Sequence, residues 1–194
     1  MSKLTTLPNI LTFTRIALIP VFVITFYLPF HWARNLAVLI FAFASFTDWL
    51  DGFLARKLKQ SSSFGAFLDP VADKLLISST LLLLVGARNI DFITLPALII
   101  VGREIVISAL REWMAEMGSR VSVAVSYIGK IKTTVQMFAL LILIAYDPGH
   151  TDLRNLGIFF LYIAAMLTIW SMIIYLNAAW PEFMKKDTKT VDTP

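Results

Sequence analysis

Residues 156–180 read LGIFFLYIAAMLTIWSMIIYLNAAW and contain no charged side chain. A transmembrane α-helix needs about 20 mostly apolar residues to cross the hydrocarbon core of a bilayer, so this stretch predicts a membrane-spanning helix. The rest of the chain agrees with it, because 58% of the 194 residues are hydrophobic, only 15% are charged, and the mean hydropathy is +0.75. A water-soluble globular domain does not fit this composition.

Five more apolar windows precede this one, which predicts an all-α polytopic membrane protein with six transmembrane helices. The windows are Ile10–Phe30, Leu36–Leu54, Phe64–Val85, Phe92–Leu110 and Val121–Tyr146, followed by Leu156–Trp180. Little of the chain is left over for a separate soluble domain. We therefore expect one membrane domain over residues 1–183 and a disordered polar tail over residues 184–194.

The basic residues of the loops and ends predict the orientation. With six crossings both termini share one side, and that side carries nine basic residues: Lys3, Arg56, Lys57, Lys59, Arg111, Arg120, Lys185, Lys186 and Lys189. The opposite loops carry three: Arg34, Arg88 and Arg154. Because Lys and Arg are enriched on the cytoplasmic side, both termini are predicted to be cytoplasmic. The net charge of +4 then reflects loops resting on anionic lipid, and we expect no nucleic-acid partner.

Ten further charged residues fall inside the predicted spans, all in their cytoplasmic halves. They are Arg15, Asp48, Asp51, Asp69, Asp73, Lys74, Arg103, Glu104, Lys130 and Lys132. One polar cavity that opens to the cytoplasm would explain this common depth. The alternative is that each side chain extends separately to the membrane surface.

Four of the aspartates lie in two short stretches, DWLDGFLAR at residues 48–56 and GAFLDPVAD at residues 65–73. Spacings of three and four place residues 48, 51, 52, 55 and 56 on one helix face, and residues 65, 69 and 73 on another. The polar link between the stretches turns the chain back, so we expect the two faces to meet as an antiparallel pair. Pro70 disfavours a helical conformation at Asp69, so we expect the third helix to begin near Asp69 instead of Gly65.

Four carboxylates in a membrane protein predict a bound cation. Each aspartate at mid-membrane costs about 2.5–3.5 kcal/mol on insertion scales, and mutual repulsion adds to this cost. An oxygen-only cluster suits Mg²⁺ or Mn²⁺. The chain has no cysteine, and His31 and His150 lie in loops on the opposite side, so we expect neither thiol nor imidazole ligands.

The two stretches together satisfy the pattern D-x2-D-G-x2-A-R-x8-G-x3-D-x3-D, which resembles the signature of the CDP-alcohol phosphatidyltransferases. LPNILTFTR at residues 7–15, GREIVISALRE at residues 102–112 and GKIKT at residues 129–133 resemble bacterial members of this family that act on sn-glycerol 3-phosphate. The resemblance covers nearly the whole chain except the tail.

The resemblance implies a homodimeric enzyme of the bacterial cytoplasmic (inner) membrane, with its active site facing the cytoplasm. Such an enzyme joins CDP-diacylglycerol to sn-glycerol 3-phosphate and forms phosphatidylglycerophosphate and CMP, using Mg²⁺ or Mn²⁺, two ions in all. Position by position, Asp48, Asp51, Asp69 and Asp73 correspond to the metal-binding aspartates, and Asp73 also to the catalytic base. Gly52, Ala55, Arg56 and Gly65 correspond to liponucleotide-binding positions. Asn9 and Thr12 are candidates for the same nucleotide site, with helix capping as the alternative.

Four cations in the fourth and fifth spans indicate an anionic acceptor, such as a phosphate monoester. These candidate glycerol-phosphate ligands are Arg103, Arg111, Lys130 and Lys132. The alternative is ion pairing with Glu104, Glu112 or Glu116, which we expect most for Arg111 and least for the two lysines. Two other functions stay open: a different family activity such as cardiolipin synthase, and an ion-coupled transporter, which would instead spread its charges through the bilayer.

Overall fold

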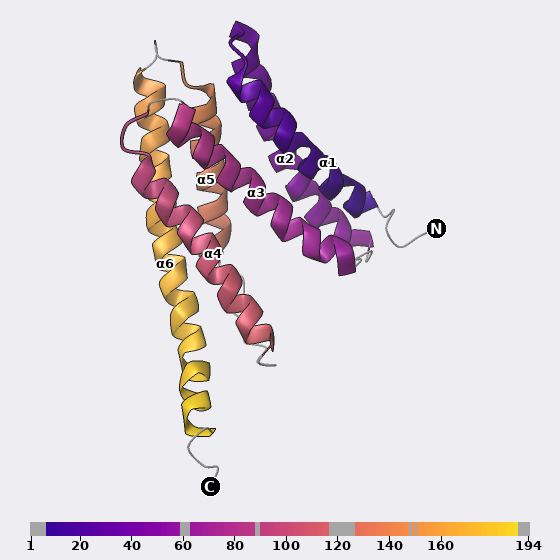
Figure 1. Cartoon of the computed structure of the whole chain (residues 1–194), viewed down its shortest axis with the longest axis vertical. Helices are drawn as coiled ribbons and strands as arrows, with labels where there is room; N and C mark the ends of the chain where they lie inside the picture. The colour runs from indigo at the N-terminus through magenta and orange to yellow at the C-terminus, as the bar shows by residue number, and fades with distance from the viewer. Residues whose placement is uncertain are drawn as a thin grey trace.

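The computed structural model describes residues 7–58, 63–87, 90–116, 127–147, 149 and 151–189. Within this part the chain is all-helical and has no strand (Figure 1). The helices are α1 (Leu7–Tyr27), α2 (His31–Leu58), α3 (Ser63–Ala87), α4 (Thr94–Glu116), α5 (Tyr127–Ala145) and α6 (Thr151–Lys189). Each predicted apolar window corresponds to one helix, although the expected beginning of the fifth window at Val121 lies outside the described residues.

The start of α3 differs from our expectation. α3 begins at Ser63, ahead of Gly65, and Pro70 lies inside it. The expected start near Asp69 was therefore wrong. Pro70 removes the hydrogen bond that its missing N–H would donate and crowds the carbonyl four residues earlier, but it stands within the first three turns of a 25-residue helix. The bonds and packing of the remaining turns outweigh that local loss.

The end of α6 also differs from our expectation. The helix extends to Lys189, so residues 184–189 are helical and the disorder expected for them was wrong. Residues 190–194 lie outside the described part. Extending an existing helix costs much less than nucleating a new one, and lysines near a helix C-terminus interact favourably with its dipole.

The helices pack in two groups that α2 and α3 join. α5 and α6 make the most extensive helix pair and α4 packs along α6, while α1 packs on α2 and on α3. α3 also contacts α4 and α5, and α2 contacts α5. In Figure 1 the start of α3 and the ends of α2, α4 and α6 point toward the lower side of the molecule. Asp48 lies in the second half of α2 and Asp69 in the first half of α3, so both aspartates lie toward this side.

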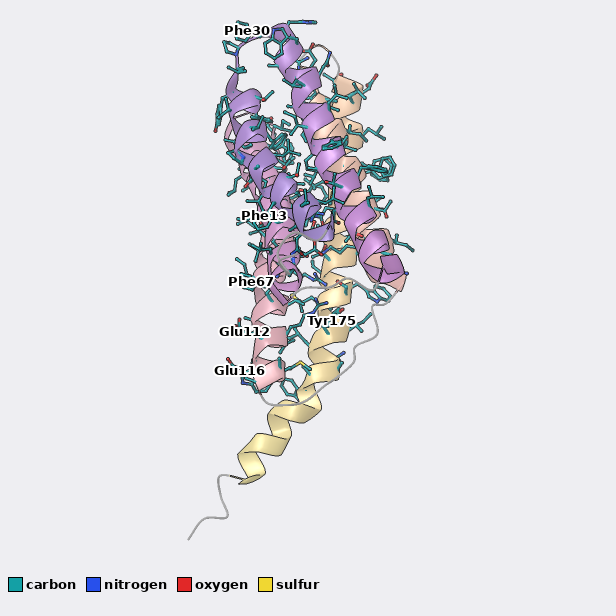
Figure 2. The ribbon with its side chains drawn as sticks, turned by 90° about the vertical axis from the view of Figure 1, so that its right-hand side faces the viewer. Phe13, Phe30, Phe67, Glu112, Glu116 and Tyr175 are labelled. Carbon is teal, nitrogen blue, oxygen red and sulfur yellow. The ribbon has the colours of Figure 1, made fainter. Side chains whose placement is uncertain are left out.

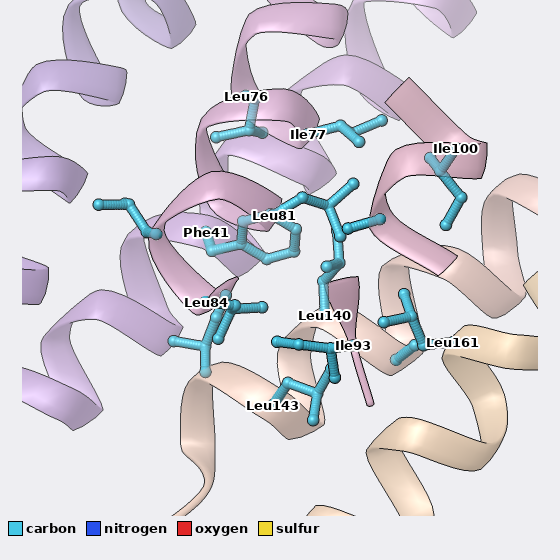
Figure 3. Close-up of a cluster of buried hydrophobic side chains, with 14 of the residues drawn as sticks. Phe41, Leu76, Ile77, Leu81, Leu84, Ile93, Ile100, Leu140, Leu143 and Leu161 are labelled. Atoms are coloured by element: carbon cyan, nitrogen blue, oxygen red, sulfur yellow. The ribbon is translucent and has the colours of Figure 1, made fainter. Parts of the chain in front are cut away.

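A continuous apolar core holds the two groups together. Phe41 of α2, Leu81 and Leu84 of α3, and Leu140 and Leu143 of α5 are almost completely buried in it (Figure 3). The α5–α6 contact is especially close at Gly157, where an added Cβ would lie 2.7 Å from Leu143 Cδ2. This core fixes the relative positions of the helices that carry the charged side chains.

The outer surface of the bundle is apolar. Large hydrophobic side chains are exposed on every helix, for example Ile24, Leu39, Leu82, Leu98, Phe138 and Trp170. Two helical stretches, Asn9–Tyr27 and Thr151–Trp180, are long and apolar enough to cross a membrane by length and composition. A surface of this kind suits lipid better than water, which indicates a membrane protein.

Candidate functional site

The guanidinium of Arg15 joins two of the predicted metal-binding aspartates. Arg15 lies on α1 and is completely buried. Its Nη1 atom lies 2.8 Å from Oδ1 of Asp48 on α2 and donates a hydrogen bond of 3.2 Å to Oδ1 of Asp69 on α3. The side chains of Asp48 and Asp69 are 35% and 45% exposed, so both carboxylates keep access to water or ions.

Arg15 lies between the two acidic faces that we expected to meet. Among the described residues, direct contact between α2 and α3 is slight, whereas α1 packs on both. Where their side chains are described, the acidic faces meet around Arg15, and Asp48 also interacts electrostatically with Asp69 and Asp73. The physical reason is charge: a buried guanidinium needs carboxylate partners, and two carboxylates this close need a cation.

Asp73 completes the part of the acidic cluster that the structure describes. It lies one turn after Asp69 on α3, and its carboxyl group is close enough to interact electrostatically with Asp48, Asp69 and Arg15. Gly65 is buried on the same helix. On α1, Asn9 and Thr12 are buried within two turns of Arg15, at the same end of the bundle.

The other signature residues lie on α2 beyond Asp48. Asp51, Gly52, Ala55 and Arg56 all fall within the helix, as their spacing predicted. The structure describes the helical backbone at these positions but not the side chains.

A second polar cluster forms where α4, α5 and α6 meet. Glu104 of α4 accepts a hydrogen bond of 2.8 Å from Arg103 and one of 2.7 Å from Lys132 of α5, both at Oε1. Lys132 is 2% exposed. Arg103 also donates through Nη2 to Ser171 Oγ of α6 at 3.3 Å. Two cations share one carboxylate, so the cluster stays positively charged.

The pairing of the cations differs from our expectation. We expected glutamate pairing most for Arg111 and least for the lysines, but Lys132 pairs with Glu104, while the ring and hydroxyl of Tyr175 contact Arg111. Lys132 is held at a buried position, where a lone ammonium would be costly. Lys130 lies on the exposed face of α5, two residues away.

The acidic and cationic clusters adjoin each other. Asp73 interacts electrostatically with Glu104, and Lys132 interacts with Asp73. The acidic cluster, whose carboxylates suit a cation-bound pyrophosphate, thus lies next to the cationic cluster, whose side chains suit a phosphate monoester. Two phosphorylated substrates could meet at this boundary.

The donor set of the acidic cluster fits a divalent cation. Asp48, Asp69 and Asp73 present only carboxylate oxygens, which are hard ligands of the kind that Mg²⁺ and Mn²⁺ prefer. Among the described side chains, which do not include that of Asp51, no three acidic or histidine groups already stand in ligand geometry.

Comparison with known proteins agrees with this chemistry. The model of the CDP-alcohol phosphatidyltransferase family matches residues 5–170, which is most of the chain. The chain belongs to this family. A CDP-diacylglycerol–glycerol-3-phosphate 3-phosphatidyltransferase of Pectobacterium atrosepticum is 58% identical over 89% of the chain and 94% of its own length. Relatives with the same name from Yersinia enterocolitica and Pseudomonas fluorescens are 54% and 52% identical, over 92% and 95% of the chain and 97% and 95% of their own lengths.

Membership confirms the resemblance drawn from the signature residues. CDP-alcohol phosphatidyltransferases are enzymes and generally depend on divalent metal ions. The transporter alternative does not agree with this membership.

The sequence did not lead us to expect that α6 supplies polar side chains to the cationic cluster. Ser171 and Tyr175 of this CDP-alcohol phosphatidyltransferase both contact arginines of α4. Their signal was present, because residues 168, 171 and 175 are polar at helical spacing in a span otherwise rich in aliphatic residues. Lys74, whose ammonium donates to Ser108 Oγ of α4, was placed in the predicted polar cavity without a partner or a role of its own.

Proposed function

We propose that the protein transfers the phosphatidyl group of CDP-diacylglycerol to sn-glycerol 3-phosphate, giving phosphatidylglycerophosphate and CMP. The observation that carries this proposal is the adjacency of the aspartate cluster and the Arg103–Glu104–Lys132 cluster. The first suits the pyrophosphate of the donor, and the second an anionic acceptor. The names of the relatives support the same substrates.

The proposal assigns the nucleotide end of the donor to α1, α2 and α3. Asn9 and Thr12 of α1, with Gly52, Ala55, Arg56 and Gly65, hold the liponucleotide. The small residues leave room beside the backbone, and Arg56 presents a planar fork to phosphate. The placement of Asn9, Thr12 and Gly65 at the same end of the bundle as Asp48 and Asp69 supports this assignment.

Asp48, Asp51, Asp69 and Asp73 hold the divalent cations, Mg²⁺ or Mn²⁺, with two ions as the proposed number. Bound there, the metal supplies positive charge that stabilises the negative charge developing on the CMP leaving group. The metal assignment is supported by the oxygen-only donor set, which lies where three helices meet.

The phosphate group of sn-glycerol 3-phosphate binds at Arg103, Arg111, Lys130 and Lys132. This binding places a free hydroxyl of the glycerol toward Asp73. The hydroxyl oxygen attacks the phosphorus that bears diacylglycerol, its proton passes to the carboxylate of Asp73, and the bond from that phosphorus to the oxygen of CMP breaks. No covalent enzyme intermediate is required. Lys132 supports this geometry, since it interacts with both Glu104 and Asp73.

We also propose that all six helices cross the bacterial inner membrane, that residues 1–183 form one membrane domain, and that the active site and both termini face the cytoplasm. α2 to α5 contain 28, 25, 23 and 19 residues. At 1.5 Å per residue each reaches about 28 Å or more, which approaches the thickness of the hydrocarbon core. The excess of basic residues on the sequence segments that share the side of the termini supports the orientation. The active form is proposed to be a homodimer.

A labelled-substrate assay tests the activity. The purified protein in detergent receives CDP-diacylglycerol labelled in its acyl chains, and one of three acceptors: sn-glycerol 3-phosphate, serine or phosphatidylglycerol. We expect labelled phosphatidylglycerophosphate and CMP only with the first acceptor, and loss of product when EDTA removes divalent ions. Product only with phosphatidylglycerol would identify a cardiolipin synthase instead, and no product with sn-glycerol 3-phosphate would overturn the proposal.

A further inference from the structure

The phenol ring of Tyr175 contacts two arginines of the predicted acceptor site. The guanidinium carbon of Arg111 lies 5.2 Å from the ring centroid, and that of Arg103 lies 5.8 Å from it. Arg111 Nη2 also donates a hydrogen bond of 3.0 Å to the Tyr175 hydroxyl. Figure 2 shows Tyr175 on the part of α6 that runs beside α4, near the level of Glu112.

A residue of another helix gives the two arginines a common contact. They are eight residues apart on α4, which corresponds to about 12 Å along the helix axis. A single aromatic side chain between them attracts both cations to its π-face. Ser171, one turn earlier on α6, adds a second hold on Arg103 at 3.3 Å, and its own hydroxyl donates to the Thr168 carbonyl at 2.9 Å.

The Nε–H group of Arg103 is left as a donor for a ligand. Its Nη1 atom donates to Glu104 and its Nη2 atom to Ser171, but its buried Nε atom has no hydrogen-bond partner among the described residues. A buried donor without a partner is costly, so such an atom indicates a missing acceptor. An oxygen of a phosphate group is an acceptor of the required kind.

We propose that Tyr175 is a positioning residue that determines acceptor specificity, because it holds Arg103 and Arg111 together so that they receive one phosphate dianion. This inference rests on the proposed function and extends it to α6. Ser171 assists through Arg103. Neither residue contacts the reacting atoms; both act through the guanidinium groups.

Kinetics of Tyr175 variants test the inference. Tyr175→Leu removes the ring and the hydroxyl, and we expect the KM for sn-glycerol 3-phosphate to rise about tenfold. Tyr175→Phe keeps the ring and loses only the hydroxyl, so the rise should be about threefold. The KM for CDP-diacylglycerol should stay within about twofold in both variants. An equal rise for both substrates, or no rise with Tyr175→Leu, would overturn the inference.

Met172→Ala is the matched control for a merely structural role. Met172 packs in the same apolar cluster between α4 and α6 as Tyr175. Its truncation removes packing there without touching a guanidinium. We expect a lower unfolding temperature and an unchanged acceptor KM. A rise of the acceptor KM equal to that of Tyr175→Leu would show that packing alone matters, and would refute the positioning role.

Inorganic phosphate separates this inference from the proposed function, because its binding is measured without turnover. Phosphate should raise the thermal unfolding temperature of the wild type and of Met172→Ala in detergent, and raise that of Tyr175→Leu less. This pattern supports the positioning role even if sn-glycerol 3-phosphate is not turned over, in which case only the proposed function fails. An equal shift in all three proteins, or none in the wild type, would overturn the inference itself.

Discussion

The Nη1 atom of Arg15 lies 2.8 Å from Oδ1 of Asp48, and the arginine side chain is completely buried. A second carboxylate, that of Asp69, lies 3.2 Å from the same nitrogen. The Arg15 guanidinium of α1 thus connects α2 to α3 through two aspartates of the signature. Substitutions can test this connection.

Replacement of Arg15 by Met should destabilise the protein. The two carboxylates would then lose the guanidinium between them, and the lost charged hydrogen bonds correspond to about 1.5–3 kcal/mol in the free energy of unfolding. Thermal unfolding in detergent at fixed Mg²⁺ concentration measures the loss. Arg15→Lys keeps the charge and should lose less. An unfolding temperature equal to that of the wild type would show that the bridge does not stabilise the helix junction.

Asp69→Asn and Asp73→Asn should each abolish CMP release while the protein still inserts in the membrane. The amide removes a negative charge that a divalent cation requires, and at residue 73 also removes the proposed proton acceptor. Initial rates of CMP formation measure the effect. Asp91→Asn, in the exposed turn before α4, is the matched control and should keep full activity. Wild-type turnover in either signature variant would refute the metal-site assignment.

Glu104→Gln should destabilise the protein more than Lys132→Met does. Glu104 accepts from both Arg103 and Lys132, so its loss leaves Lys132 buried without a carboxylate, whereas loss of Lys132 leaves Glu104 paired with Arg103. Leaving a buried charge unpaired costs about 3–5 kcal/mol. The double variant removes the stranded ammonium and should regain part of this loss. A double-mutant cycle by thermal unfolding decides the matter, and purely additive losses would contradict the coupling.

Lys130→Ala should weaken binding of the acceptor without lowering stability. Lys130 lies on the exposed face of α5, so its contribution is an exposed charge of about 0.2–1 kcal/mol. The KM for sn-glycerol 3-phosphate should rise about two- to fivefold, and more at low than at high salt. Lys130→Arg should behave like the wild type. A parallel rise of the KM for CDP-diacylglycerol would remove Lys130 from the acceptor site.

Gly157→Ala should loosen the packing of α5 on α6. The added methyl group would meet Leu143 Cδ2 at 2.7 Å and Ile142 Cγ2 at 3.2 Å. Overpacking of this kind costs about 1–3 kcal/mol, which thermal unfolding detects. Gly86→Ala on α3 is the control, because nothing lies within 4 Å of its added Cβ and alanine favours the helix. Equal unfolding temperatures for both variants would mean that the α5–α6 contact adapts.

The sequence predicted the six helices well, because a run of about 20 apolar residues is a long and redundant signal. It predicted their ends less well. Pro70 suggested a later start for α3, and the polar residues after Pro181 suggested a tail, yet both segments are helical. Local signals at helix ends are worth only a few kcal/mol, and neighbouring turns outweigh them.

The candidate site was partly predictable for a related reason. The spacing of residues 48, 51, 69 and 73 follows from helix geometry, so their faces could be read from the sequence. The partner of Arg15 and the role of Tyr175 could not, because each contact joins residues more than 30 positions apart on different helices. Only the packing of the helices places these side chains together.

The bridge at Arg15 also bears on how the chain is made. Its guanidinium belongs to α1, while the carboxylates that neutralise it belong to α2 and α3, which are synthesised after α1. Until then the nascent segment exposes a charge that lipid penalises by about 2.5–3.5 kcal/mol. If α2 and α3 cross the membrane beside α1, as proposed, the three helices avoid this cost by assembling before α1 faces lipid alone.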